Sequence, residues 1–220
     1  MRERRRRGRN LRADIANAAA RMLVEGEADS FAAAKRKAAA QLGVSDARQA
    51  PDNLEVQAAI IGYQRVFEPV EAGARVTRMR EAALAAMRFF APFSPRLVGP
   101  VLYGTAFEHS SIALHLFDDE VEAVSRFLVQ HGIAYRLAEK TLATGGRALE
   151  TYTVFEVSRQ DFDFELVVMP HKRLIQAPLS PLDGQPYRRM SAAALEALLA
   201  EGRGDAVLWG DRSGSAILDG

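Results

Sequence analysis

Three carboxylates and a histidine lie at positions from which they could share one metal ion. Asp163 and Glu165 are two residues apart in a stretch where apolar and polar residues alternate, and this spacing places both side chains on one face of a strand. His115 lies in an apolar stretch, and Glu108 precedes it in a loop. Together the four side chains could bind a transition metal ion. The alternative is that His115 is hydrogen-bonded within a sheet while Asp163 and Glu165 face water.

The segment from Leu97 to Phe117 carries the second candidate site. It reads as a strand over residues 97–103, a turn at Gly104-Thr105, and a strand over residues 111–117. Glycine permits close approach of the backbone to a ligand, and a threonine hydroxyl can hydrogen-bond to phosphate. This order of strand, small-residue turn and strand resembles the signature of the nucleotidyltransferase superfamily. The resemblance extends to about residue 170.

The resemblance implies a site where three carboxylates hold two magnesium ions, two carboxylates from positions i and i+2 of one strand and the third from a neighbouring strand. Ser111 and Ala113 stand where the acidic pair should be, and Glu165 stands in the third position. Serine is a weak, neutral magnesium ligand, and alanine is none. We therefore expect a catalytically degenerate nucleotidyltransferase-like protein that binds a nucleotide or a protein partner. The residues expected to contact the ligand are Gly104, Thr105, Ser111 and His115.

Two other functions stay open at this point. An active transferase would use Glu165 as its catalytic and metal-binding carboxylate, with Asp163 or Glu108, and would require Mg²⁺. A nucleic-acid-binding protein would use the basic N-terminus, where residues 2–12 hold seven arginines against one glutamate while the rest of the chain is acidic. The same arginines could instead form a solubilising, disordered tip. The arginines assigned to nucleic-acid contact are Arg2, Arg4, Arg5, Arg6, Arg7 and Arg9.

Composition excludes several other classes of protein. The chain has 220 residues, of which 48% are apolar, so it can build a sizeable core. The absence of cysteine excludes disulfides, thiol chemistry and cysteine-ligated zinc or iron–sulfur sites. No apolar run approaches the roughly 20 residues of a membrane helix, and the basic start does not lead into a signal-peptide pattern. We expect a cytoplasmic protein that does not associate with a membrane.

Periodicity predicts the elements that must position these residues. Helical spacing runs through residues 13–92, where Ser30 and Asp52 or Asn53 can cap helices. Beyond Pro92 and Pro95 the pattern changes to strands over 97–103, 111–117, 134–142, 150–157 and 162–168, with helices after Asp119 and Ser191. The fold class expected is α+β. Its parts are a basic disordered arm over 1–12, a helical region over 13–92, a nucleotidyltransferase-like domain with a mixed sheet and flanking helices over 93–201, and a loose tail over 202–220.

Overall fold

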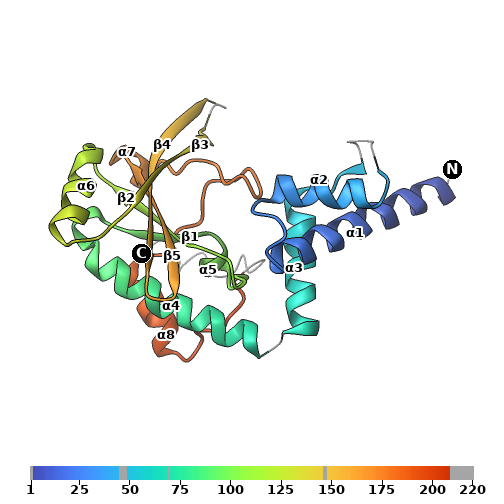
Figure 1. Ribbon diagram of the computed structural model, residues 1–220, viewed down its shortest axis with the longest axis horizontal. Helices are drawn as coiled ribbons and strands as arrows, with labels where there is room; N and C mark the ends of the chain where they lie inside the picture. Colours follow the sequence, from blue (N-terminus) through green and yellow to red (C-terminus); the bar gives the residue numbers. More distant parts are fainter. Residues whose placement is uncertain (1, 45–48, 69, 146–147, 209–220) are drawn as a thin grey trace. The chain divides into compact units, whose positions relative to one another are not determined.

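The computed structural model shows an α+β chain that divides into two compact units (Figure 1). The helical unit comprises residues 1–71 and 107–109, and the sheet unit comprises residues 72–106 and 110–220. The structure describes all residues except 1, 45–48, 69, 146–147 and 209–220, and it describes residues 2–10 by their backbone alone. Within these described ranges, no helix is both long enough and apolar enough to cross a membrane.

Three helices form the helical unit: α1 (Arg2–Val24), α2 (Phe31–Gln41) and α3 (Asn53–Phe67). The caps predicted from the sequence are present. Ser30 accepts a hydrogen bond from the backbone N–H of Ala33, and Asp52 forms a capping box with Glu55. The core of the unit contains the buried side chains of Ile15, Ala19, Leu23, Ala34, Ala38, Val56 and Ile60. Small alanines at these contacts let the three helices approach closely.

Helix α1 begins at Arg2, so residues 2–12 belong to a helix and not to the disordered arm predicted from the sequence. Arginine has a high helix propensity, which favours extension of the helix toward the N-terminus. Arg12 also ties this part of α1 to the start of α3, because its Nε lies 2.6 Å from Oε2 of Glu55. The side chains of the six arginines before it lie outside the described part, so their contact with nucleic acid stays a prediction.

The sheet unit is built on five strands in the order β1-β2-β5-β4-β3. Strands β2 and β5 are parallel, and the other neighbours are antiparallel. The strands are β1 (Arg96–Val98), β2 (Ile112–Phe117), β3 (Arg136–Ala143), β4 (Leu149–Arg159) and β5 (Phe162–Met169). The helices are α4 (Glu71–Phe89), the 3₁₀ turn η2 (Ala91–Phe93), α5 (Gly99–Tyr103), α6 (Val121–Gln130), α7 (Lys172–Ile175) and α8 (Ala192–Ala200).

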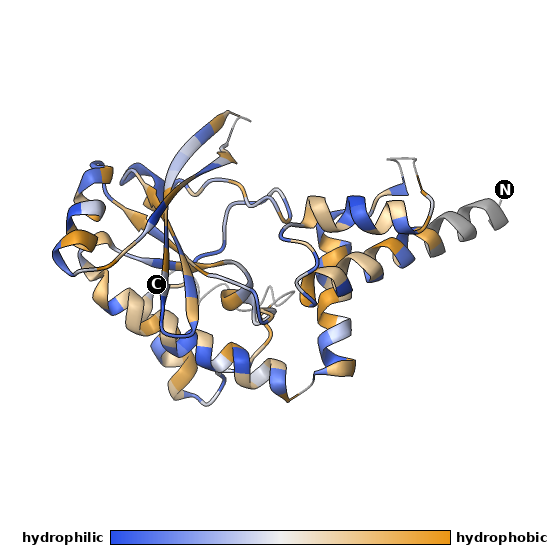
Figure 2. Cartoon of the chain, viewed as in Figure 1, coloured by the Kyte–Doolittle hydropathy of each residue, from blue (hydrophilic) through white to orange (hydrophobic). Residues whose placement is uncertain are grey.

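The period-two pattern of the strands gives the sheet two different faces. One face packs against α4, α6 and α8 in the larger core, which includes Leu114, Leu116, Leu166 and Val168. Charged and apolar residues are interspersed along α4 (Figure 2), so one side of this helix can join the core while the other meets water. The opposite face carries a smaller core of Phe117, Leu142, Tyr152, Val154, Val167 and Met169. The first residues of β2 and β5 on that face remain partly exposed.

Two sequence-based boundaries differ from the structure. Helix α4 belongs to the sheet unit, so the units divide at Glu71 and not at residue 92, because the apolar residues of α4 pack on the sheet. The strand predicted over residues 97–103 ends at Val98, and helix α5 follows it. Gly99 adopts a φ of 74°, and Pro100 stands in the first turn of α5, where its fixed φ suits a helix and its missing N–H is not needed.

Candidate ligand-binding site on the sheet

The parallel pairing of β2 with β5 brings together residues that are 52 positions apart in the sequence. Glu165 lies opposite Ala113 of β2 on one side and opposite Glu156 of β4 on the other. Ser111 immediately precedes β2, and Asp163 lies two residues before Glu165 on the same face. The neighbouring strand expected to carry the third carboxylate is therefore β5, adjacent to β2 in the sheet.

Each of three carboxylates at this end of the sheet face has a polar partner from another strand. The partners neutralise or hydrogen-bond to the oxygens that a metal ion would need. The three pairs are Lys140 with Glu165, Arg136 with Glu156 at 3.1 Å between Nη2 and Oε2, and Ser158 with Asp163 at 2.5 Å between Oγ and Oδ1. Sequence reasoning missed Lys140, Arg136 and Glu156, because only the strand order shows that β4 lies beside β5 and that β3 follows β4.

The ion pair of Lys140 with Glu165 spans three strands. Lys140 lies on β3 and Glu165 on β5, with β4 between them in the sheet. Only a long side chain such as lysine can cross that width. The side chains of Lys140 and Glu165 are 33% and 30% exposed, so water and a dissolved ligand can reach both groups.

The metal site suggested by Glu108, His115, Asp163 and Glu165 is not formed. The described residues contain no group of three or more histidine or carboxylate side chains that could hold a metal ion. Asp163 is exposed and bonded to Ser158, whereas His115 is 1% exposed. Glu108 belongs to the helical unit. The ammonium of Lys140 also repels a cation from Glu165, so these residues do not fit the two magnesium ions of the nucleotidyltransferase signature.

His115 is a buried part of the sheet and not a ligand-facing residue. Its Nδ1 accepts a hydrogen bond from Nε of Arg189 at 3.2 Å, and its ring meets the Tyr187 ring edge-on at 4.8 Å between centroids. Burial, and then the positive charges of Arg189 and Lys140, lower the pKa of His115 well below its ordinary value. The imidazole is therefore neutral at pH 7, which agrees with the hydrogen-bonded sheet residue that the sequence offered as the alternative.

Arg189 completes this buried cluster, and nothing in the sequence signalled it. Its guanidinium donates to His115 and to the backbone carbonyl of Arg173, and it lies 4.9 Å above the centre of the Phe117 ring. Burial, and then the positive charge of Arg96, lower the pKa of Arg189 to about 10. The cluster consists of His115, Phe117, Tyr187 and Arg189. It covers the half of the sheet face that lies next to the Lys140–Glu165 pair.

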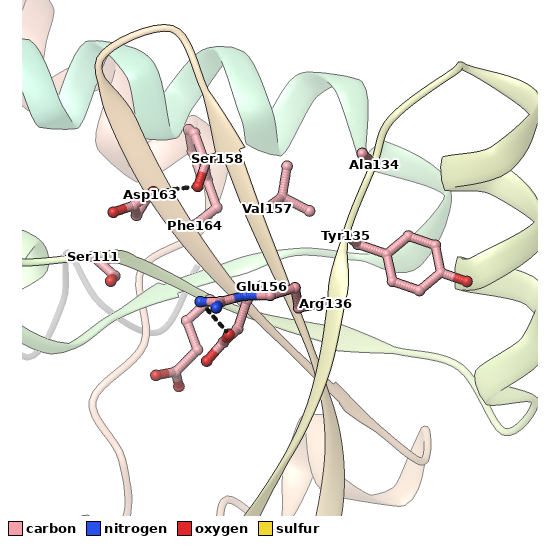
Figure 3. A pocket seen from close by; sticks show the side chains of 10 residues that line it. Ser111, Ala134, Tyr135, Arg136, Glu156, Val157, Ser158, Asp163 and Phe164 are labelled. Atoms are coloured by element: carbon pink, nitrogen blue, oxygen red, sulfur yellow. Dashed lines mark hydrogen bonds and ion pairs between the residues drawn. The ribbon is translucent and has the colours of Figure 1, made fainter.

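A pocket of about 420 Å³ opens at the end of the sheet where β2 and β5 begin. Figure 3 shows the side chains of Ser111, Arg136, Glu156, Ser158 and Asp163 around it, with the two dashed contacts between β3, β4 and β5. Glu165 also lines the pocket. Of the predicted site residues, the pocket thus joins Ser111, Asp163 and Glu165. A site with hydroxyls, carboxylates and a guanidinium suits a polar ligand that offers both donors and acceptors.

Gly104 and Thr105 do not line this pocket. Gly104 ends helix α5 with a φ of 75°, and the N–H of Thr105 donates to the carbonyl of Pro100 at 2.9 Å. The turn is covered by the chain itself, since a Cβ added to Gly104 would lie 2.3 Å from the carbonyl oxygen of Ala206. Thr105 is 1% exposed. The ligand contact expected at these two residues stays a prediction.

No protein-family model, curated protein or solved structure matches this chain. Its possible function must therefore be argued from the residues of the sheet face themselves.

Proposed function

We propose that this protein binds a nucleotide without a metal ion and does not catalyse phosphoryl or nucleotidyl transfer. The observation that carries the proposal is the Lys140–Glu165 ion pair beside Ala113. In a nucleotidyltransferase-like site, a divalent cation would neutralise the carboxylate at Glu165 and bind the phosphates. Here the ammonium of Lys140 neutralises Glu165. An ammonium also binds phosphate as a point charge with three N–H donors.

The charge of the site favours a nucleotide with few phosphates. Lys140 and Arg136 supply two cations, whereas Glu156, Asp163 and Glu165 supply three carboxylates. One cation freed from its pair can hold a phosphate, but a triphosphate would meet net repulsion without a metal. The carboxylates accept hydrogen bonds from ribose hydroxyls and base amino groups. We therefore expect a nucleoside monophosphate to bind more tightly than the corresponding triphosphate.

The absence of transfer follows from the donor set. Two-metal catalysis needs several carboxylates that converge on both ions, because the ions activate the attacking oxygen and stabilise the leaving oxygen. Ala113 offers no ligand, Ser111 offers a neutral hydroxyl, and Glu165 is paired with Lys140. A lysine carries a single charge and cannot bridge two phosphate groups as a divalent ion does.

Thermal unfolding of the full chain against a panel of mono-, di- and triphosphates, each with EDTA or with Mg²⁺, tests the proposal. A ligand at one hundred times its Kd stabilises the folded state by about 2.7 kcal/mol, which corresponds to roughly 5–10 °C for a chain of this size. We expect a monophosphate to raise Tm in EDTA. Lys140→Ala should weaken binding about tenfold, as expected for loss of one charge-assisted hydrogen bond, and should therefore reduce the rise in Tm to about half at the same ligand concentration.

The matched control is Lys37→Ala, which removes a lysine that is also paired with a glutamate, Glu27, but lies in the helical unit. It should leave nucleotide binding unchanged. A rise in Tm that requires Mg²⁺ and a triphosphate would contradict metal-independent binding. Transfer of radiolabel from a nucleoside triphosphate that Glu165→Ala abolishes would instead establish the active transferase.

A further inference from the structure

Residues 203–208, which we call the C-terminal strap, lie over the turn formed by Gly104 and Thr105. The turn contacts the backbone of the strap and not solvent. A Cβ added to Gly104 would lie 2.3 Å from the Ala206 carbonyl oxygen and 3.0 Å from Cα of Val207. Only glycine permits this approach. The turn that the sequence assigned to a ligand is thus in contact with the chain's own backbone.

Two anchors hold the strap in place. At its start, Nη1 of Arg80 donates to the carbonyl of Gly204 at 2.9 Å. At its end, the N–H of Leu208 donates to the carbonyl of Tyr103 at 2.9 Å, and the Leu208 side chain packs on the larger core. Between the anchors, Asp205 and Val207 are exposed. A segment held at its ends and exposed in the middle can be released by breaking one anchor.

Next to Gly104, the turn carries a hydroxyl that has no partner. Oγ1 of Thr105 is buried and makes no hydrogen bond within the described part of the chain. A buried hydroxyl without a partner is unfavourable, so a ligand oxygen that replaced the strap would satisfy it. The turn ends helix α5, and the first residue of α5 lies beside the sheet site, since a Cβ added to Gly99 would lie 3.9 Å from Cβ of Ala113.

We infer that the C-terminal strap is an autoinhibitory cover, and that its release exposes Thr105 and the backbone of Gly104 to the phosphate end of the nucleotide. This inference rests on the proposed nucleotide binding at the Lys140–Glu165 site. Apparent affinity falls in proportion to the fraction of molecules in the competent state. If about one molecule in ten has an open strap, then opening the strap in every molecule tightens nucleotide binding about tenfold. Locking the strap closed in every molecule abolishes binding.

A reversible disulfide can lock the strap, because the native chain has no cysteine. A Cβ added to Gly73 of α4 would lie 3.2 Å from Cβ of Asp205, close to the roughly 3.5–4.5 Å separation of disulfide-bonded cysteines. In full-length Gly73→Cys/Asp205→Cys, we expect calorimetry in EDTA to show that oxidation abolishes adenosine monophosphate binding. Reduction of the same sample should restore it. The two single-cysteine variants control for each substitution.

Leu208→Asp provides the opposite test, since a carboxylate cannot remain in the apolar core. Amide exchange of residues 203–208 should accelerate, and monophosphate binding should tighten about tenfold if the closed state dominates. Val207→Asp is the matched control, because Val207 is 48% exposed and its change should alter neither measurement. Equal affinities for the oxidised and reduced cysteine pair, or faster exchange in Leu208→Asp with unchanged affinity, would overturn the inference. Failure of the wild-type, reduced and released proteins alike to bind any nucleotide would refute the proposed function instead.

Discussion

Ala113 and Glu165 lie directly opposite each other in the parallel pairing of β2 with β5. The methyl group of Ala113 occupies the position from which a second carboxylate would face Glu165, and Ser111 offers only a hydroxyl at the next position on that face. The side chain that does reach Glu165 is Lys140. The positive charge beside Glu165 is therefore supplied by a side chain of the protein, the ammonium of Lys140.

Introducing an acidic pair at residues 111 and 113 should create a magnesium site. In Ser111→Asp/Ala113→Asp, two more carboxylates would join Glu156, Asp163 and Glu165 on one face of the sheet, and their repulsion should lower Tm in EDTA. Mg²⁺ should then raise Tm by binding the folded state alone. The neutral variant Ser111→Asn/Ala113→Asn has nearly the same shape and should not respond to Mg²⁺. Identical melting of the acidic variant with Mg²⁺ and with EDTA would show that these positions do not converge on a metal site.

Arg80 should be among the residues most important for stability of the sheet unit. It is fully buried and donates to three backbone carbonyls, those of Val101, Leu102 and Gly204. Replacement by methionine keeps much of the volume but leaves these carbonyls without their donor. We expect a loss of about 3 kcal/mol or more in urea unfolding, since each buried polar group left unpaired costs roughly 1–3 kcal/mol.

The control for this prediction is Arg88→Met on the same helix. Arg88 pairs with Glu196 at 2.7 Å, but their side chains are 59% and 58% exposed. Exposed pairs contribute at most about 1 kcal/mol, so this change should be small. Equal losses in the two variants would mean that the buried carbonyls find other donors.

Stability should fall as the pH drops below the ordinary pKa of histidine, partly because of His115. Burial and two neighbouring cations lower the pKa of His115 well below 6.5 in the folded protein. Below pH 6.5 the unfolded chain therefore binds a proton that the folded chain does not bind, and the free energy of unfolding decreases by up to about 1.4 kcal/mol per pH unit. His115→Gln keeps an acceptor for Arg189 but cannot titrate. The difference between wild-type and variant stability should be constant above pH 7 and should shrink toward pH 5, whereas parallel curves would contradict a neutral buried His115.

The nucleic-acid interpretation of the N-terminus makes a separate prediction. If these arginines bind phosphates, replacing all six by glutamine should abolish binding of duplex DNA or RNA in a mobility-shift assay. The affinity of the wild type should fall with salt at a slope of about 0.9 for each phosphate contacted on DNA. The residues to replace are Arg2, Arg4, Arg5, Arg6, Arg7 and Arg9.

Arg12 is kept in that variant because it pairs with Glu55. Glutamine at Lys35, Arg36 and Lys37 of α2 provides the control for general loss of basic charge. Binding that survives replacement of the six N-terminal arginines would end this interpretation.

The sequence by itself determined the local features of the fold. The helix cap at Asp52, the helix starts at Ser30 and Ser191, and the alternating strand at Phe162–Met169 are all present. These features depend on residues a few positions apart, so the periodicity and capping chemistry of the chain are enough to predict them. Local reasoning failed at Gly99-Pro100, where the apolar composition indicated a strand but the backbone preferences of these residues begin a helix.

Only the tertiary structure decided which side chains meet. Glu165 is 25 positions from Lys140, and Gly104 is 102 positions from Ala206 of the strap. Their contacts depend on the order of the strands and on the surfaces that pack together, which are non-local and cannot be read from periodicity. The same reasoning explains His115, whose strand was predictable but whose burial depends on Tyr187 and Arg189. The sequence thus specified the elements of the site. Packing decided that Glu165 forms an ion pair with Lys140 and that the strap covers Gly104.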